Sequence, residues 1–112
     1  MPEVTITAAQ LRQAADLIAR RGMWTKWTYA VDEDGQTTDP HDIFACKWCA
    51  VGAVAHVALL SPWGAEKGLF QIDPAAEELT NVNDRRGKRA AVAELRRLAD
   101  LAEERERAVT NA

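Results

Sequence analysis

Two cysteines and a histidine lie close together in the segment CKWCAVGAVAH, residues 46–56. Thiolates and imidazoles are usual zinc ligands, so a metal site is the first chemistry to test. Cys49 and His56 would lie about 10.5 Å apart along a helix that rises 1.5 Å per residue. Zinc holds its ligands at about 2.0–2.3 Å, so these two side chains could not share one ion. The metal or thiol site that remains as an alternative is His41, Cys46 and Cys49.

A thiol nucleophile meets the same geometric difficulty. His56 is too far along a helix to take a proton from Cys49, which leaves only His41 as a base. A position near a helix N-terminus would lower the pKa of Cys49, but the surrounding residues offer no evident oxyanion donor. A redox pair of Cys46 and Cys49 lacks the β-α-β pattern that such pairs accompany. We therefore interpret Cys49 as a small buried core residue and His56 as a core histidine bonded to a backbone carbonyl, and we expect no cofactor and no catalysis.

The amino-acid composition is typical of a soluble globular domain. The chain has 112 residues, of which 47% are hydrophobic and 28% charged, with a net charge of −3. One domain spanning residues 1–112 is expected from this length. No apolar run approaches the roughly 20 residues that span a bilayer, and the start MPEVTITAAQ lacks the basic and apolar regions of a signal peptide. We expect a cytoplasmic protein with reduced cysteines.

Local signals place the first elements that would position these residues. Thr7 and Gln10 match a capping box, and Ile6 with Leu11 forms the hydrophobic staple, which predicts a helix over 8–21. Aromatic and β-branched residues followed by the turn signal Asp34-Gly35 predict a hairpin over 27–38. Its face formed by Trp27, Tyr29 and Val31 should pack on helices.

The remaining elements are predicted to be helical. An almost uninterrupted apolar run predicts a central helix over 46–60, in which Gly52 permits close approach of a neighbour. Ser61-Pro62 and Asp73-Pro74 predict short helices over 62–67 and 74–80, with Gly68 ending the first. A final helix is expected over 86–107. The predicted fold is mainly α: a bundle of four to five helices around the central apolar helix, with a short β-hairpin insertion.

Charge is divided between two segments. Residues 30–44 carry five acidic side chains and no Lys or Arg, whereas residues 85–97 are strongly basic. The basic run starts where a helix is expected, and positive charge opposes the dipole there, so either the helix begins later or the cluster meets an anion. Exposed aromatic residues and arginines favour a protein interface. The candidate partner-binding residues are Trp24, Trp27, Tyr29, Arg85, Arg86, Lys88, Arg89 and Arg96.

Several short motifs resemble a family of small uncharacterised proteins from actinobacteria and their bacteriophages. They are Trp24-Thr25, Asp39-Pro40 with Asp42, Trp48-Cys49-Ala50 with Gly52-Ala53, and Asn83-Asp84 with Gly87. The departures are a second Trp-Thr pair at Trp27-Thr28 and the highly basic segment 85–89. The resemblance implies no activity and no catalytic residue; it implies a phage or prophage setting in which such proteins bind host proteins.

These observations favour a non-catalytic protein-interaction module, a phage or prophage accessory protein that binds a host protein. A homodimer through the C-terminal helix is also expected, because Leu95, Leu98 and Leu101 could seat a second helix. Asn83-Asp84 is interpreted as a cap and turn. The alternatives are the thiol or metal site named above and a weak nucleic-acid binder through Arg85, Arg86, Lys88 and Arg89.

Overall fold

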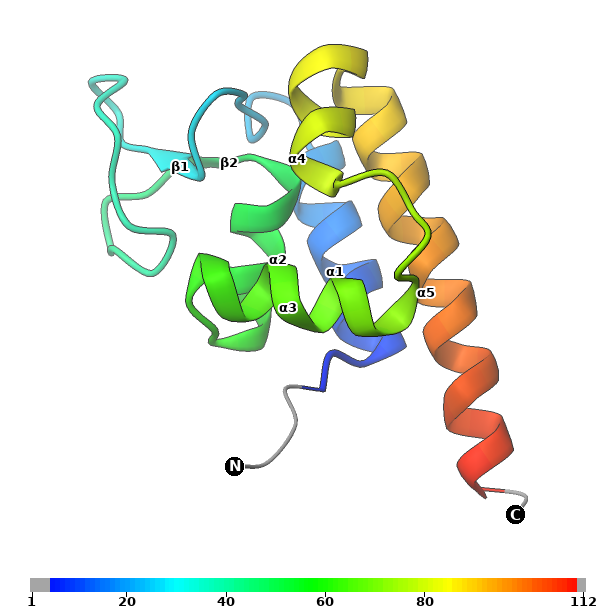
Figure 1. Ribbon diagram of the computed structural model, residues 1–112. Coiled ribbons are helices and arrows are strands. Elements are labelled where there is room, and N and C mark those ends of the chain that lie inside the picture. The colour runs from blue at the N-terminus through cyan, green and yellow to red at the C-terminus, as the bar shows by residue number, and fades with distance from the viewer. Residues whose placement is uncertain (1–4, 111–112) are drawn as a thin grey trace.

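The structure is a computed structural model and describes residues 5–110. Within this range the chain forms five α-helices and one two-stranded sheet, with an additional π-helical turn before the last helix. In chain order they are α1 (Ala8–Ala19), β1 (Ala30–Val31), β2 (Lys47–Trp48), α2 (Ala50–Ala58), α3 (Pro62–Ile72), α4 (Leu79–Asn81), the π-helical turn Val82–Arg86, and α5 (Lys88–Thr110). Figure 1 shows α1, α2 and α5 packed together, with the strands at one side and the last turns of α5 extending beyond the body. The predicted mainly α fold with a short hairpin is confirmed.

The start of α1 follows from local hydrogen bonds. Thr7 Oγ1 accepts from the backbone N–H of Gln10 at 3.1 Å, and the backbone N–H of Thr7 donates to Gln10 Oε1 at 3.0 Å. The predicted capping box is therefore confirmed. The helix ends at Ala19, two residues before the predicted end, because Arg20 is already extended and Gly22 turns the chain with a φ of +79°.

The interface between α1 and α5 joins apolar burial to a set of ion pairs. Leu11 and Ile18 of α1 and Leu95 of α5 have no exposed surface, and Leu98 has almost none. Leu95 and Leu98, two of the three leucines named for homodimerisation, are thus buried within the chain, whereas Leu101 is only partly buried.

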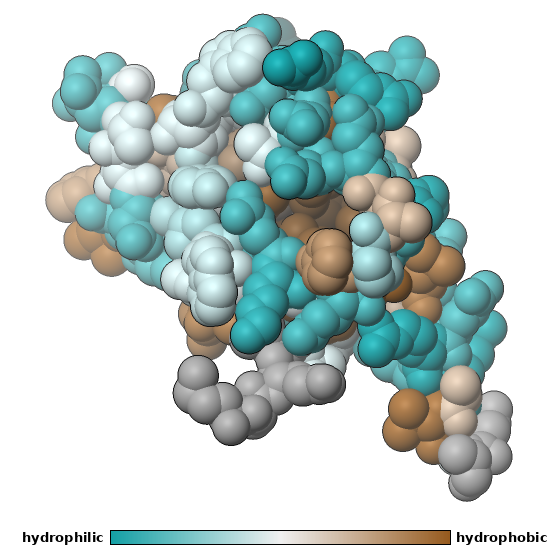
Figure 2. Space-filling view, viewed as in Figure 1, coloured by the Kyte–Doolittle hydropathy of each residue, from teal (hydrophilic) through white to brown (hydrophobic). Residues whose placement is uncertain are grey.

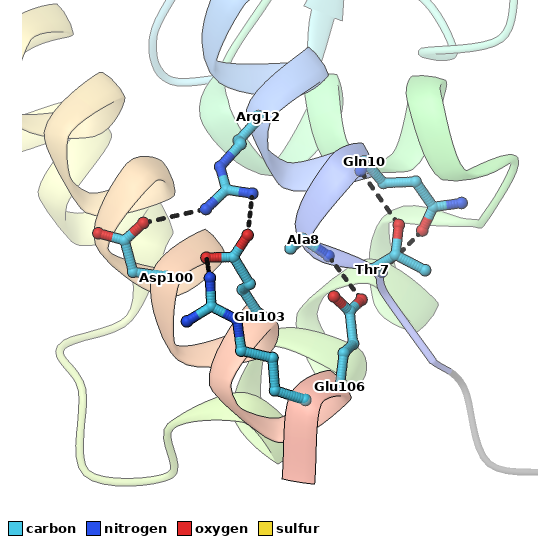
Figure 3. Close-up of polar contacts among 8 residues, drawn as sticks. Thr7, Ala8, Gln10, Arg12, Asp100, Glu103 and Glu106 are labelled. Atoms are coloured by element: carbon cyan, nitrogen blue, oxygen red, sulfur yellow. Dashed lines mark hydrogen bonds and ion pairs between the residues drawn. The ribbon is translucent and has the colours of Figure 1, made fainter. Parts of the chain in front are cut away.

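Polar contacts line the edge of the same interface. The Arg12 guanidinium donates to Asp100 at 3.1 Å and to Glu103 at 3.3 Å, and Glu106 accepts from the first backbone N–H of α1, that of Ala8 (Figure 3). Glu106 thus supplies an acceptor at the positive end of α1. These contacts fix the direction of α5 over nearly two helical turns.

The central helix α2 begins at Ala50, four residues later than predicted. Residues 46–49 are extended, because their backbone pairs with the segment before Asp32. The N–H of Cys46 donates to Val31 and that of Cys49 donates to Tyr29, while β2 pairs antiparallel with β1. Helix α2 ends at Ala58, with Leu59 in a left-handed conformation. Five of its first six residues are buried apolar side chains, which makes α2 the centre of the core as expected.

The hairpin itself is confirmed, but the prediction of its packed face is wrong. Asp32 and Gln36 close the turn with Gly35 at a φ of +79°, and Val31 forms a bridge with Thr37. Val31 is buried as predicted, whereas Trp27 is 69% exposed and Tyr29 36%. Trp27 has a positive φ, so the strand alternation on which the prediction rested is broken there.

The C-terminal half also departs from the predicted bounds. Helix α3 continues through Gly68 to Ile72. The helix expected over 74–80 is reduced to α4, because Asp73 closes a turn by accepting from the N–H groups of Ala75 and Ala76. Helix α5 begins at Lys88 and extends to Thr110. In residues 5–110 no helix is long and apolar enough to cross a membrane.

Candidate functional site

Asn83 is the one fully buried polar side chain in residues 5–110. Its Oδ1 accepts from Trp24 Nε1 at 2.8 Å and from the backbone N–H of Ala50 at 2.9 Å. Its Nδ2 donates to the carbonyl of Thr25 at 3.2 Å and to Asp84 Oδ1 at 3.0 Å. The amide thereby uses both donors and both acceptor positions. One side chain joins the start of α2, the segment after α1 and the π-helical turn.

The π-helical turn explains how Asn83 reaches the interior. A π turn holds one more residue than an α turn, so consecutive Val82 and Asn83 both face inward and both are buried. Gly87 then ends the turn with a φ of +91°, and α5 starts anew at Lys88. Arg85 and Arg86 therefore stand at the C-terminal end of one helical segment, where positive charge is favourable. The later helix start accounts for Arg85 and Arg86, whereas Lys88 and Arg89 lie in the first turn of α5.

Trp27, which contacts this network through Asp84, has a left-handed backbone conformation that bulky residues rarely adopt. Its φ is +71°, and its ring is among the large exposed hydrophobic groups of the chain. The backbone N–H of Trp27 donates to Asp84 Oδ1 at 3.0 Å. Lys26 Nζ lies 5.7 Å from the centre of the ring. Left-handed backbone in an L-residue costs roughly 1–2 kcal/mol, so the neighbouring structure must hold it in place.

Three of the candidate partner-binding residues are engaged within the chain. Trp24 is half-buried, and its indole N–H is used on Asn83. Lys88 Nζ donates to the carbonyl of Arg20 at 3.2 Å, just beyond the end of α1. Arg96 is paired with Asp16 of α1 at 3.6 Å. Trp24 and Lys88 thus position elements, whereas the Arg96 pair joins two largely exposed side chains and is weak.

The other candidates are closer to solvent. Arg86 pairs loosely with Glu77 at 3.4 Å, and Tyr29 donates its hydroxyl hydrogen to Glu66 at 3.2 Å. Arg85 and Arg89 are exposed, and neither forms an ion pair within the described part of the chain. Among the candidates, Trp27, Arg85 and Arg89 are exposed and their side chains form no hydrogen bond or ion pair within the described residues, and Lys26 lies beside the Trp27 ring. We call these four residues the Trp27 surface.

Cys49 is buried and serves as the N-cap of α2. Only 3% of the residue is exposed, and its Sγ accepts from the backbone N–H of Gly52 at 3.3 Å. Burial raises the pKa of Cys49 to about 11, and the hydrogen bonds from the helix N-terminus offset this only in part. The predicted lowering of this pKa is wrong, because desolvation of the thiolate outweighs the helix N-terminus. At neutral pH the thiol is protonated and a poor nucleophile.

The histidines are used on backbone carbonyls. His56 Nδ1 lies 2.8 Å from the carbonyl oxygen of Pro40, which confirms the expected core contact. His41 Nε2 lies 2.6 Å from the carbonyl oxygen of Leu60. Among residues 5–110 no three His, Cys, Asp or Glu side chains gather closely enough to hold a metal ion.

Gly52 allows the hairpin to approach α2. A Cβ atom at this position would lie 1.9 Å from the carbonyl oxygen of Tyr29, far inside the van der Waals contact distance. Only glycine lets the backbone at Tyr29 lie directly on the helix, as the sequence predicted in general terms. This contact fixes the distance between α2 and the segment that carries Trp27.

Sequence reasoning missed the role of Asn83. The sequence predicts Asn83-Asp84 to be a cap and turn, but the Asn83 side chain is buried and bonds Trp24, Thr25 and Ala50 instead. The dipeptides Trp24-Thr25, Trp27-Thr28 and Asn83-Asp84 stand out in the sequence and could have drawn attention to this site. They lie far apart in the chain, however, and no local pattern indicates that they are in contact.

Together the fold and this site define a small, mainly helical protein in which a buried amide network fixes an exposed tryptophan. The chain belongs to a family of unknown function (DUF6197), whose model matches residues 2–110. This agrees with the resemblance to an uncharacterised family. The chain matches no curated protein and no solved structure.

Proposed function

We propose that this protein is a non-catalytic protein-interaction module that binds its partner through the Trp27 surface. The proposal rests on one observation: an exposed tryptophan is kept in a left-handed conformation by a carboxylate that is itself anchored to a buried amide. The finer setting, a phage or prophage accessory protein that acts on a host protein in the cytoplasm, comes from the resemblance described above.

The position of Trp27 has no evident benefit for folding. A ring that is 69% exposed buries little apolar area, and its backbone is strained. Strained residues of this kind concentrate at functional sites, where the surrounding structure keeps them in place. A rigid tryptophan is also the side chain that most often dominates the energetics of a protein interface. Prior ordering of the ring lowers the entropy lost on binding.

Charge indicates the chemistry of the partner. Lys26 lies beside the Trp27 ring, and Arg85 follows Asp84 directly in the chain. Arg89 lies one turn further, in the first turn of α5. A partner surface with an apolar pocket and acidic residues around it would complement this arrangement and would associate faster at low salt. We therefore expect an acidic protein partner.

Affinity capture from host lysate with three matched baits tests the proposal. The baits are the natural protein, Trp27→Gly, which removes the ring and suits the positive φ, and Trp63→Ala, which removes a ring that is 70% exposed elsewhere. The proposal expects one stoichiometric acidic protein on the natural bait and on Trp63→Ala, with at least a tenfold loss on Trp27→Gly. Equal recovery on Trp27→Gly, or no partner on any bait even after crosslinking, would contradict it.

A further inference from the structure

A cavity of about 170 Å³ lies between α2, α3, α4, α5 and the segment that joins α3 to α4, and none of the four residues of the Trp27 surface lines it. Figure 2 looks into a hollow in this region, with hydrophobic residues at its floor and hydrophilic residues around it. The buried part of the apolar lining comes from Val51, Leu69, Leu79 and Leu98, and Ala76 and the exposed Phe70 complete it. A cavity of roughly 150 Å³ with such a lining is large enough for benzene. The space therefore suits about six carbon atoms.

Every charged side chain that lines this cavity is acidic. The four carboxylates belong to Glu66, Asp73, Glu77 and Glu78. Arg97 neutralises Asp73 at 3.0 Å, and Arg86 approaches Glu77 at 3.4 Å, so two of the four have a partner of opposite charge. Glu66 and Glu78 form no ion pair in the described residues. The mouth of an apolar cavity therefore carries net negative charge.

Glu66 is the carboxylate whose position is fixed. Its Oε1 accepts from the Tyr29 hydroxyl at 3.2 Å and from Thr80 Oγ1 at 3.3 Å. These two donors come from different parts of the chain, so the carboxylate is held between them. No hydrogen bond from the described residues reaches Oε2, which leaves it available to a donor from outside. An oriented acceptor beside an apolar space is the arrangement that recognises a ligand with one polar end.

We propose that this cavity binds an alkyl chain of about six carbons that ends in an ammonium group, with the chain on the leucine-rich floor and the ammonium at Glu66. An apolar ligand alone would leave the carboxylates unpaired, and an anionic ligand would be repelled by them. An ammonium group supplies three donors, which matches an acceptor-only carboxylate. The same chemistry occurs in a free alkyl amine and in the lysine side chain of a peptide.

The test is a titration of the full-length protein with n-hexylamine, n-hexanol and hexanoate, followed by NMR at the methyl groups of Leu79 and Leu98. We expect n-hexylamine to bind about tenfold more tightly than the alcohol or the acid, and each methylene removed to weaken binding about fourfold. A lysine derivative blocked at both ends is compared with n-butylamine, which has the same four-carbon chain. Tighter binding of the lysine derivative assigns the site to a peptide, and weaker binding assigns it to a free amine. Equal affinity for all three probes, or no response at these methyl groups, would overturn the proposal.

Variants separate the polar end from the apolar floor. Glu66→Gln should reduce n-hexylamine binding about tenfold and leave n-hexanol unchanged, whereas Glu104→Gln, on the exposed end of α5, should change neither. Ala76→Leu adds bulk to the cavity lining and should abolish binding of both probes, while Ala75→Leu at the exposed neighbouring position should not. Unchanged amine binding in both Glu66→Gln and Ala76→Leu would place the ligand elsewhere and overturn the assignment.

Tyr29 gives an independent readout, because it is the one tyrosine of the chain and bonds Glu66. Burial and then the charge of Glu66 raise its pKa. An ammonium group at Glu66 should neutralise that charge and lower the pKa of Tyr29 toward its ordinary value. Ultraviolet titration of tyrosinate with and without n-hexylamine measures this shift, and an unchanged or higher pKa in the loaded protein would contradict binding at Glu66.

Discussion

One carboxylate oxygen, Asp84 Oδ1, lies 3.0 Å from the backbone nitrogen of Trp27 and 3.0 Å from Nδ2 of Asn83. It accepts a hydrogen bond from each. A buried amide and an exposed, strained tryptophan are thus connected through a single atom. Because Asn83 also bonds Trp24 and the start of α2, the conformation at Trp27 depends on the correct assembly of three separate segments.

Asn83→Ala should strongly destabilise the protein. The change leaves Trp24 Nε1 and the backbone N–H of Ala50 buried without an acceptor, and each such loss costs about 1–3 kcal/mol. We expect the free energy of unfolding in urea to fall by about 3–5 kcal/mol. Asn81→Ala, an exposed position two residues earlier, is the control and should change it by less than about 0.5 kcal/mol. Similar losses in the two variants would contradict the role of Asn83.

At position 27 we expect the glycine variant to be more stable than the alanine variant, whereas alanine is usually the more stabilising of the two residues. Trp27 has a φ of +71°, which alanine adopts only with strain and glycine adopts freely. We expect Trp27→Gly to exceed Trp27→Ala in free energy of unfolding by about 1 kcal/mol. Ala93→Gly on the exposed side of α5 should instead lose about 1 kcal/mol. The usual order at position 27 would show that the residue is not left-handed in solution.

How far the sequence reveals the structure depends on whether a signal is local. The α1 start was predictable because Thr7 and Gln10 carry it within one turn. The start of α2 was not, since the extended state of Lys47 and Trp48 depends on pairing with β1, sixteen or more residues earlier. Likewise, no 3.6-residue period indicates that Asn83 faces inward, because a π turn shifts the period.

The candidate site shows the same limit. The exposure of Trp27 could not be read from its neighbours, because aromatic and β-branched residues there favour a strand. The composition of residues 85–89 identifies a basic cluster, but it does not indicate what each of these side chains contacts. Lys88 proved to contact α1 through Arg20, whereas Arg89 one residue later is exposed. Composition identifies such residues, and only their contacts separate structural from available side chains.

Gly52→Ala should be poorly tolerated. The added methyl group would lie 1.9 Å from the carbonyl oxygen of Tyr29, a backbone atom that a rotamer change cannot move. We expect a loss of about 3 kcal/mol or more in thermal or urea unfolding, since overpacking against backbone forces the hairpin away from α2. Gly64→Ala is the matched control. Its added methyl group meets side chains alone, Ser61 at 3.3 Å and Leu60 at 3.7 Å, and should change stability by about 1 kcal/mol or less.

Cys49 should make stability fall at alkaline pH. The thiol ionises near its ordinary pKa of 9.0 when unfolded and at about 11 when folded, so the unfolded state binds fewer protons between these values. The stabilising effect is complete below the unfolded pKa and is lost as the pH rises through this window, by roughly 2–3 kcal/mol in total. Cys49→Ser keeps a good N-cap and removes this titration. Urea unfolding of both proteins across the window should show a steeper decline for the natural protein, and parallel curves would contradict a buried thiol.

Site-specific photo-crosslinking in host cells tests the central claim, that Trp27 anchors a protein partner, most directly. A photoreactive residue is placed at Lys26, whose Nζ lies 5.7 Å from the Trp27 ring, or at Lys67, whose Nζ lies 5.2 Å from the equally exposed ring of Trp63. The account predicts one covalent adduct with a single acidic protein from position 26, absent from position 67 and lost when Trp27→Gly is combined with it. An adduct from position 67 alone, from both positions in equal yield, or from neither would contradict the account.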